Sequence, residues 1–178
     1  MSKFGFSPTF IRWIKACIKS PWIALLVNGR LTKFFQATKG IRKGCSLSPY
    51  PYLMVADSLS RKLQQQQDLG ELKGLKSARG VRVVNHAHLD DDTILLGGAS
   101  TIIAERFNSV LSTFLNATDG KLNVTKSKVY GWNCPLGIMA RISRILGFEG
   151  ITTWNSFNYL GIPIFKGEKK GWLEWTNR

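Results

Sequence analysis

The sequence predicts a mixed α+β domain in which amphipathic helices alternate with short strands that form hairpins. Three observations support this prediction. Apolar residues recur at helical spacing in several segments, and shorter apolar runs flank residues that favour tight turns. In addition, 44% of the 178 residues are hydrophobic, which is enough to form a core. The sequence shows no internal repeat and no clear linker, so it corresponds to one modest domain or to part of a larger one.

The expected elements follow in a regular order. They are a helix over residues 8–19, a β-hairpin of 23–27 and 31–35, a helix from 49 to about 67, strands at 81–89 and 93–96, a helix from about 101 to 120, a strand at 124–132, a helix at 137–146, and a strand or tight hairpin at 159–165. Ser7-Pro8 and Ser48-Pro49 each predict a helix start, because Ser can cap a helix and Pro fits its first turn. Asn28-Gly29 predicts a type I′ turn, because both residues tolerate positive φ angles.

The third helix is predicted from a stripe of apolar residues and from its two ends. Ser100 or Thr101 can cap its start, and Gly120 is expected to end it. The apolar residues of the stripe are Ile103, Phe107, Val110 and Phe114. Because they share one side of a helix, they are expected to face the core.

The net charge of +14 is unevenly distributed along the chain. Residues 1–80 carry 14 Lys or Arg and 3 acids, whereas residues 81–178 carry 11 and 8. A pI near 10.1 is typical of proteins that bind phosphate groups and release counterions. This pattern favours a nucleic-acid partner, and a solvated Lys-rich surface or a ribosomal or histone-like basic protein would explain the charge alone.

Three consecutive aspartates, Asp90, Asp91 and Asp92, lie where a strand is expected to turn back on itself. Adjacent carboxylates repel each other unless a cation neutralises them, and Mg²⁺ binds through one or two carboxylates together with substrate phosphates. The triplet therefore indicates metal-dependent phosphoryl transfer, in which two ions stabilise the attacking and leaving oxygens. The alternative is that Asp is simply a good turn residue.

Six segments in a fixed order resemble one protein family. They are residues 4–14 (FGFSPTFIRWI), 27–29 (VNG), 39–50 (KGIRKGCSLSPY), 89–96 (LDDDTILL), 120–128 (GKLNVTKSK) and 159–163 (YLGIP). Together they are similar to the reverse transcriptase of plant LINE-type (non-LTR) retrotransposons, and the similarity covers nearly the whole chain. It implies a palm subdomain, which is a small antiparallel sheet backed by helices, in an RNA-directed DNA polymerase.

The resemblance assigns a role to each matching residue. Asp91 would be the direct Mg²⁺ ligand, and Asp92 would support the second metal or fix the hairpin. Lys126 would neutralise or protonate the departing pyrophosphate, although a solvated surface lysine is an equal alternative. Segment 159–163 would support the primer end, and a core hairpin would explain it equally well. The residues that would lie along template and nucleotide are Arg42, Lys43, Gly44, Ser48 and Pro49, where a basic loop meets a helix N-terminus that favours anions.

Several positions depart from the family pattern. The family shows Gln-Gly-Asp-Pro where this chain has residues 43–46, Lys-Gly-Cys-Ser, which puts nucleotide selection in doubt. Leu89 and Asp90 replace an aromatic and a small residue beside the aspartate pair, and a third carboxylate could draw the metal out of position. His86 matches a common family histidine and His88 replaces an apolar residue; both are expected to be strand residues and not metal ligands.

The family also holds its metals with a further aspartate on an earlier strand, and Met1 comes just after that point. Residues 1–178 are therefore expected to be a partial, incomplete reverse transcriptase domain: a palm with the start of a thumb-side segment, without the upstream catalytic strand and most of the fingers. Little or no polymerase activity is expected of this chain alone. Two alternatives stay open, a non-catalytic basic nucleic-acid-binding remnant and a product that is unstable or not made.

The partners implied by the resemblance are an RNA template, a DNA primer and deoxynucleotides. No membrane partner is expected, because no apolar run reaches the roughly 20 residues of a membrane helix. The N-terminus does not resemble a secretory signal. Cys17, Cys45 and Cys134 are scattered, so neither a disulfide partner nor a zinc site is expected. These features favour an intracellular protein, with nucleus and cytoplasm both open.

Overall fold

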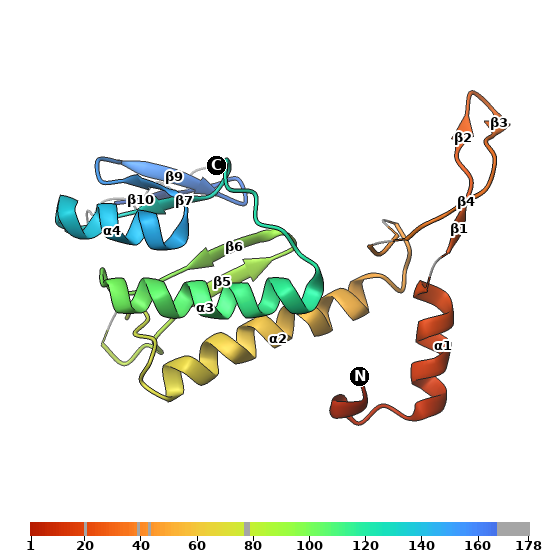
Figure 1. Ribbon diagram of the computed structural model, residues 1–178, viewed down its shortest axis with the longest axis horizontal. Helices are drawn as coiled ribbons and strands as arrows, with labels where there is room; N and C mark the ends of the chain where they lie inside the picture. The colour runs from red at the N-terminus through yellow and green to blue at the C-terminus, as the bar shows by residue number, and fades with distance from the viewer. Residues whose placement is uncertain (20, 39, 43, 77–78, 167–178) are drawn as a thin grey trace. The chain divides into compact units, whose positions relative to one another are not determined.

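The computed structural model describes residues 1–19, 21–38, 40–42, 44–76 and 79–166 (Figure 1). The chain divides into two compact units, residues 1–57 and 58–178. The described part contains a short 3-10 helix (Ser2–Phe4), four α-helices and ten short strands. The helix α2, Pro49–Asp68, contributes residues to both units. The prediction of a mixed α+β chain is confirmed.

The helix α1 spans Pro8–Ile18 and begins as predicted. The Ser7 hydroxyl oxygen accepts a hydrogen bond from the backbone N–H of Phe10 at 3.2 Å, and Pro8 occupies the first helical position. This cap satisfies one of the backbone donors that a helix N-terminus leaves unpaired. Ile14 is the buried residue of the helix.

A ribbon of two short antiparallel pairs follows α1. The strand β1 (Trp22–Ile23) pairs with β4 (Phe35–Gln36), and β2 (Leu26–Val27) pairs with β3 (Arg30–Leu31). Asn28 and Gly29 have φ angles of 48° and 75°, so the predicted turn is confirmed. The apolar residues of β2 and β3 are largely exposed. We refer to residues 22–36 as the ribbon.

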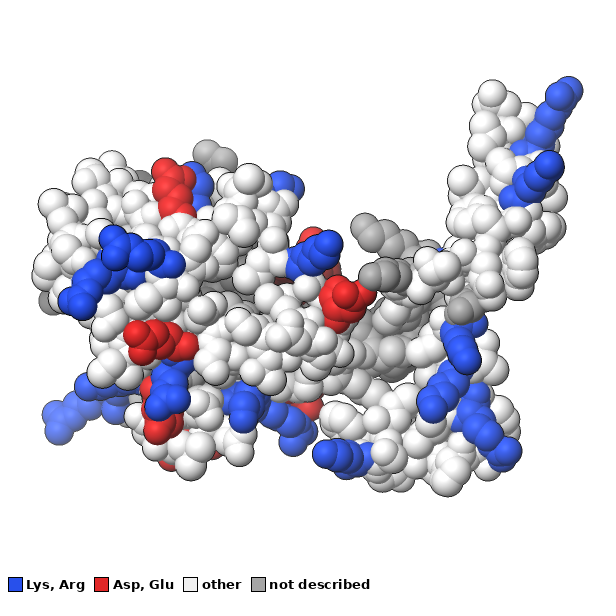
Figure 2. Space-filling view, in the orientation of Figure 1, with Lys and Arg blue, Asp and Glu red and all other residues white. Residues whose placement is uncertain are grey.

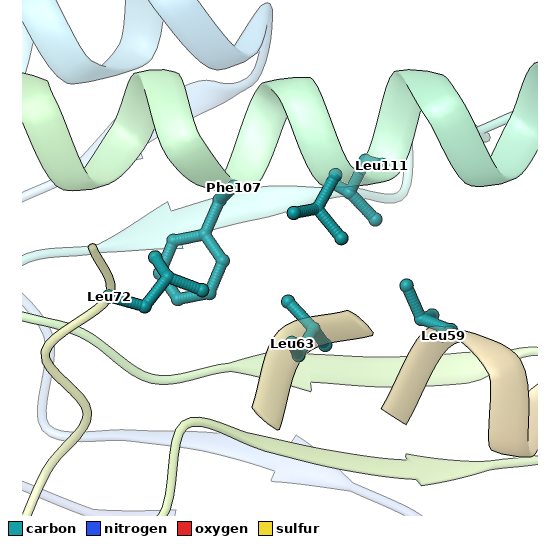
Figure 3. Packing of buried hydrophobic residues seen from close by; sticks show 6 residues of the cluster. Leu59, Leu63, Leu72, Phe107 and Leu111 are labelled. Atoms are coloured by element: carbon teal, nitrogen blue, oxygen red, sulfur yellow. The ribbon is translucent and has the colours of Figure 1, made fainter. Parts of the chain in front are cut away.

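The second unit is built around a helix pair. Residues of α2 and of α3 (Thr101–Thr118) form the buried cluster of Figure 3, together with Leu72 from the connection that follows α2. The members of this cluster are Leu59, Leu63, Leu72, Phe107, Val110 and Leu111. Phe107 and Val110 belong to the stripe predicted from the sequence, and Leu63 is fully buried. The helix α3 ends where Asp119 adopts a φ of 53°, one residue before the predicted Gly120.

The predicted strand at 81–89 is shorter in the structure. The strand β5 covers only His86–Leu89 and pairs antiparallel with β6, Asp92–Leu95. Before β5, Val84 makes an isolated antiparallel bridge to Leu75, so the Gly/Lys-rich connection is partly paired. Leu95 of β6 packs against the buried cluster, and this contact attaches the hairpin to the helix layer.

The predicted strand at 124–132 is too long, and the sequence did not indicate its partner strand. The strand β7 covers Lys128–Tyr130 and pairs parallel with β8, Glu149–Ile151. The crossover between them is α4, Leu136–Leu146, which contacts both α3 and β8. A helical crossover between parallel strands is the usual βαβ connection. This pair is the exception among the described strand pairs, which are otherwise antiparallel.

The segment at 156–165 forms a tight hairpin. The strand β9 (Ser156–Tyr159) pairs with β10 (Ile162–Phe165), and both turn residues, Leu160 and Gly161, have positive φ angles. Of the two predicted possibilities, the hairpin is therefore confirmed. Phe157 stacks on Tyr130 of β7 with ring centroids 4.5 Å apart, so the hairpin packs on the βαβ unit.

Candidate functional site

The aspartate triplet lies at the tip of the β5–β6 hairpin. Asp90 and Asp91 form its two-residue turn, and Asp92 is the first residue of β6, opposite Leu89. Asp90 has a φ of 49°, a backbone conformation that Asp and Asn adopt more readily than other non-glycine residues. All three aspartates are exposed. The hairpin therefore presents adjacent carboxylates to solvent at one point of the fold.

The strand register assigns the hairpin residues to two faces. His86 lies opposite Leu95, and His88 lies opposite Thr93; directly paired residues share a face. Because Leu95 packs against the helices, this face is the inner one. Successive residues of a strand point to opposite faces, so Asp92, which is next to Thr93, lies on the outer face. The two histidines are strand residues, as predicted, and the Nδ1 of His88 is 2.5 Å from the Thr93 hydroxyl oxygen.

Tyr159 of β9 lies close enough to Asp92 for the two side chains to interact electrostatically. Burial raises the pKa of the Tyr159 hydroxyl, and the negative charge of Asp92 raises this pKa further. The last residue of β9 is therefore brought near the hairpin tip, although the two residues are far apart in the sequence. Segment 159–163 and the aspartates were predicted as separate motifs, and the structure brings these two motifs together.

The donor atoms at the tip suit a hard divalent cation. Exposed carboxylate oxygens are the protein ligands that Mg²⁺ prefers, and Mg²⁺ keeps several waters of its own. In the part of the chain that the structure describes, no group of three or more His, Cys, Asp or Glu residues could enclose a metal ion. Asp91 and Asp92 thus fit part of a metal shell, and the remaining ligands would have to come from water, substrate or further carboxylates.

The loop before α2 is tied together by its own hydrogen bonds. The Ser48 hydroxyl donates to the backbone oxygen of Arg42 at 2.7 Å, and the backbone N–H of Ser48 donates to the backbone oxygen of Cys45 at 3.0 Å. Gly44 has a φ of 75°, which glycine adopts without strain. Pro49 begins α2. Lys43, which the sequence also predicted for this site, lies outside the described residues.

The thiol of Cys45 lies in a part of this loop that favours negative charge. The pKa of its thiol is lowered, first by a hydrogen bond from the backbone of Leu47, then by the Ser48 side chain, and also by the charge of Arg42. The direction of this shift agrees with the position of Cys45 just before a helix N-terminus, where negative charge is favoured. The sequence marked Cys45 only as a departure from the family pattern.

Lys126 lies in a turn and not on the predicted strand. The side-chain oxygen of Asn123 accepts hydrogen bonds from the Thr125 hydroxyl at 2.7 Å and from the backbone N–H of Lys126 at 3.2 Å. The Ser127 hydroxyl donates to the backbone oxygen of Asn123 at 2.9 Å. These bonds fix the backbone at 123–127 and leave the Lys126 side chain exposed.

Charge is distributed differently over the two units. Residues 1–57 contain nine Lys or Arg and a single acid, Asp57, for a net charge of +8. In Figure 2, the surface over α1 and the ribbon shows basic side chains and no acidic ones on the face in view. The first unit is thus strongly electropositive in its own right.

Two further findings bear on the class of protein. None of the helices in the described ranges combines the length and the apolar character needed to cross a bilayer. Cys17, Cys45 and Cys134 are free thiols.

Two comparisons with known proteins bear on the family of this chain. A stretch of 72 residues, 40% of this chain, is 28% identical to an uncharacterized mitochondrial protein of Arabidopsis thaliana. The matched stretch spans 59% of the length of that relative. The family model described as reverse transcriptase (RNA-dependent DNA polymerase) matches residues 1–164. Since this match covers nearly the whole described chain, including the aspartate hairpin and the loop before α2, the protein belongs to the reverse transcriptase family.

Proposed function

We propose that this chain is a partial palm of a reverse transcriptase from a plant LINE-type retrotransposon, with the β5–β6 hairpin as its metal-binding element. Residues 1–178 would form the palm and the start of a thumb-side segment. The observation that carries the proposal is the exposure of Asp91 and Asp92 at a two-residue turn inside a reverse transcriptase family match. The family reaction is the template-directed addition of deoxynucleotides to a primer 3′-hydroxyl.

The residues of this chain would divide that work. Asp91 would hold Mg²⁺, and Asp92 would complete or orient that site from the outer face of β6. When bound, the metal supplies charge stabilisation for the triphosphate and the attacking oxygen. Tyr159 would limit the space beside Asp92 and help to place the primer end. Lys126 would offer a proton or a positive charge to the pyrophosphate that leaves.

The loop before α2 would bind the phosphates of template or nucleotide. This role is supported by the charge of Arg42 in this loop and by the N-terminus of α2, which begins at Pro49 directly after it and favours anions. Gly44 allows the turn, and Pro49 begins the helix whose N-terminus favours the anion. For Lys43 the proposal rests on its sequence position alone.

The isolated chain is expected to lack measurable polymerase activity. Two neighbouring carboxylates hold only part of a two-metal site, and losing one element of this electrostatic stabilisation typically costs about 10²–10³-fold or more in rate. The assay is primer extension with the full chain on an RNA template, in Mg²⁺ or Mn²⁺. Template-dependent synthesis that is abolished in Asp91→Asn would refute the proposed inactivity.

Metal binding can be tested without activity. We expect Mn²⁺ to broaden the NMR signals of residues 90–93, and Asp91→Asn or Asp92→Asn to weaken this effect. Glu105→Gln is the matched control, because Glu105 is an exposed acid on α3 and its replacement removes the same charge at another place. Equal broadening in the Asp91→Asn and Glu105→Gln variants would contradict the assignment of the metal ligands.

A second candidate function is non-catalytic binding of nucleic acid by the first unit, favoured by its net charge of +8. It predicts sequence-tolerant binding whose affinity falls steeply with salt. Binding should survive Asp91→Asn and weaken in a double variant, Arg42→Ala with Lys43→Ala. An affinity for single-stranded RNA that stays flat between low and moderate salt would exclude this function.

A further inference from the structure

A buried polar side chain lies at the base of the β5–β6 hairpin. Asn85 is 2% exposed, and it is the only polar residue among the buried residues of the described chain. Its Nδ2 donates a hydrogen bond to the backbone oxygen of Leu63 in α2 at 3.1 Å. Its own backbone oxygen accepts from the N–H of Leu96 at 2.8 Å, just beyond β6. A single residue thus joins both arms of the hairpin to the helix layer.

The hydrogen bond to Leu63 fixes the orientation of the Asn85 amide. Because a carbonyl oxygen can only accept, the NH₂ group must face Leu63, and the Asn85 Oδ1 must then act as an acceptor on its other side. The His86 Nδ1 lies 2.5 Å from that oxygen. His86 therefore carries its proton on Nδ1. Burial lowers the pKa of His86, and the nearby His88 lowers it further, so the neutral ring is favoured.

From this network we propose that Asn85 is a positioning residue that clamps the hairpin to α2 and so sets where Asp91 and Asp92 stand. The inference rests on the proposed role of these aspartates as metal ligands. The clamp acts at the base of the hairpin together with Leu95, which makes an apolar contact with the buried cluster. Leu95 attaches the hairpin through non-directional packing, whereas the hydrogen bond from Asn85 to Leu63 also fixes the orientation of the hairpin base relative to α2. The contact with His86 holds the Asn85 amide in the orientation that this bond needs.

Because the hairpin is long, a small rotation at its base displaces the carboxylates at its tip. The strand β5 ends at Leu89, four residues beyond Asn85, which is about 13 Å along an extended strand. A rotation of roughly 5° at the base would then move the hairpin tip by about 1 Å. A displacement of about 1 Å at a reacting centre can cost on the order of 10²-fold in rate. A clamp that limits small rotations is therefore needed where the carboxylates must meet a metal.

The test compares three variants of the full chain by NMR. Asn85→Leu removes both side-chain bonds, whereas Asn85→Asp keeps the acceptor for His86 and loses the donor to Leu63. Met139→Ala is the control, because Met139 is a buried residue of α4 outside the cluster that holds the hairpin. The readouts are the tautomer of His86 from its ring ¹⁵N shifts, the backbone amide shifts of residues 90–93, and the affinity for Mn²⁺.

In the wild type we expect the His86 proton on Nδ1. In Asn85→Leu we expect the His86 proton to redistribute toward Nε2 and the amide shifts at residues 90–93 to exceed those of Met139→Ala several-fold. We also expect the Mn²⁺ affinity to fall by about tenfold, because the two carboxylates lose their fixed orientation. Asn85→Asp should keep the proton on Nδ1 of His86 and still shift the tip amides. This second variant decides the question if Asn85→Leu does not fold.

Two results would overturn the proposal: a wild-type His86 protonated on Nε2, or tip amides that move no further in the Asn85 variants than in Met139→Ala. The metal readout separates this inference from the proposed function. If Mn²⁺ does not bind near Asp91 in the wild type, the proposed metal site fails, and the tautomer and amide shifts still decide whether Asn85 positions the hairpin.

Discussion

Replacing Leu63 with alanine should remove a substantial part of the stability of the second unit. Leu63 is fully buried between α2 and α3 (Figure 3), and the neighbouring side chains come from two helices and a loop that cannot all collapse into the space. Leu→Ala changes at such sites cost about 3–5 kcal/mol, because lost transfer free energy and a residual cavity add together. Against a typical total of about 5–15 kcal/mol, this loss is large.

The measurement is urea unfolding of wild type and Leu63→Ala, followed by the helical circular dichroism signal. We expect the midpoint to fall while the slope with denaturant stays unchanged, since the surface exposed on unfolding is nearly the same. Leu69→Ala is the matched control, because Leu69 follows α2 and is 65% exposed; its effect should stay within about 0.5 kcal/mol. If the two variants differed by less than about 1 kcal/mol, the assignment of Leu63 to the centre of the core would be wrong.

Two further predictions follow from the same unit. The pKa of His86 is lowered on folding, by burial and then by His88. The unfolded chain therefore binds the proton more readily than the folded one. The contribution of His86 to the free energy of unfolding is complete above about pH 6.5 and is lost as the pH falls below this value. Urea midpoints between about pH 5 and 7.5 should show a drop on the acid side that His86→Gln reduces, and an equal drop in both proteins would contradict the pKa direction. Gly97→Ala should cost about 1–3 kcal/mol, because a Cβ there would come within 2.8 Å of the Phe107 ring and 2.9 Å of Ile103. Gly98→Ala, which has open space around it, should be nearly neutral, and similar melting temperatures for the two variants would argue against the close approach of Gly97 to α3.

Local signals predicted much of this fold. Ser7-Pro8 placed the start of α1 and Asn28-Gly29 placed the ribbon turn, because each dipeptide restricts its own backbone without help from distant residues. The aspartate hairpin was predicted for the same reason. Its register was not predicted, because residues 93–96 are almost continuously apolar except for Thr93; the structure shows it to be set by the two-residue turn at Asp90 and Asp91.

The errors arose where side chains compete with the backbone or where distant residues decide. The predicted strand at 124–132 loses its first residues because Asn123 bonds its own neighbours and holds them in a turn. The strand β8 has no strong strand pattern, and its Gly150 is required because a Cβ would collide with the Ser143 hydroxyl. Neither contact is visible in the sequence around β8.

The candidate site was predicted as residue types and not as an arrangement. The sequence named Asp91, Asp92, Lys126 and the loop before α2, but it did not show that Tyr159 lies near Asp92. It also gave no sign that Asn85 bonds α2. Both relations join segments distant in the chain, and only tertiary packing brings them together.

The ribbon has a practical consequence for work with the purified chain. Leu26 and Leu31 at its tip are each 69% exposed, and short ribbons with apolar faces tend to stick to one another. The positive charge of the same unit opposes this attraction by mutual repulsion, which salt screens beyond about 10 Å at 0.1 M. Solubility should therefore be highest in dilute buffer. It should decline as salt is added, because salt weakens the repulsion between chains and leaves the apolar attraction in place.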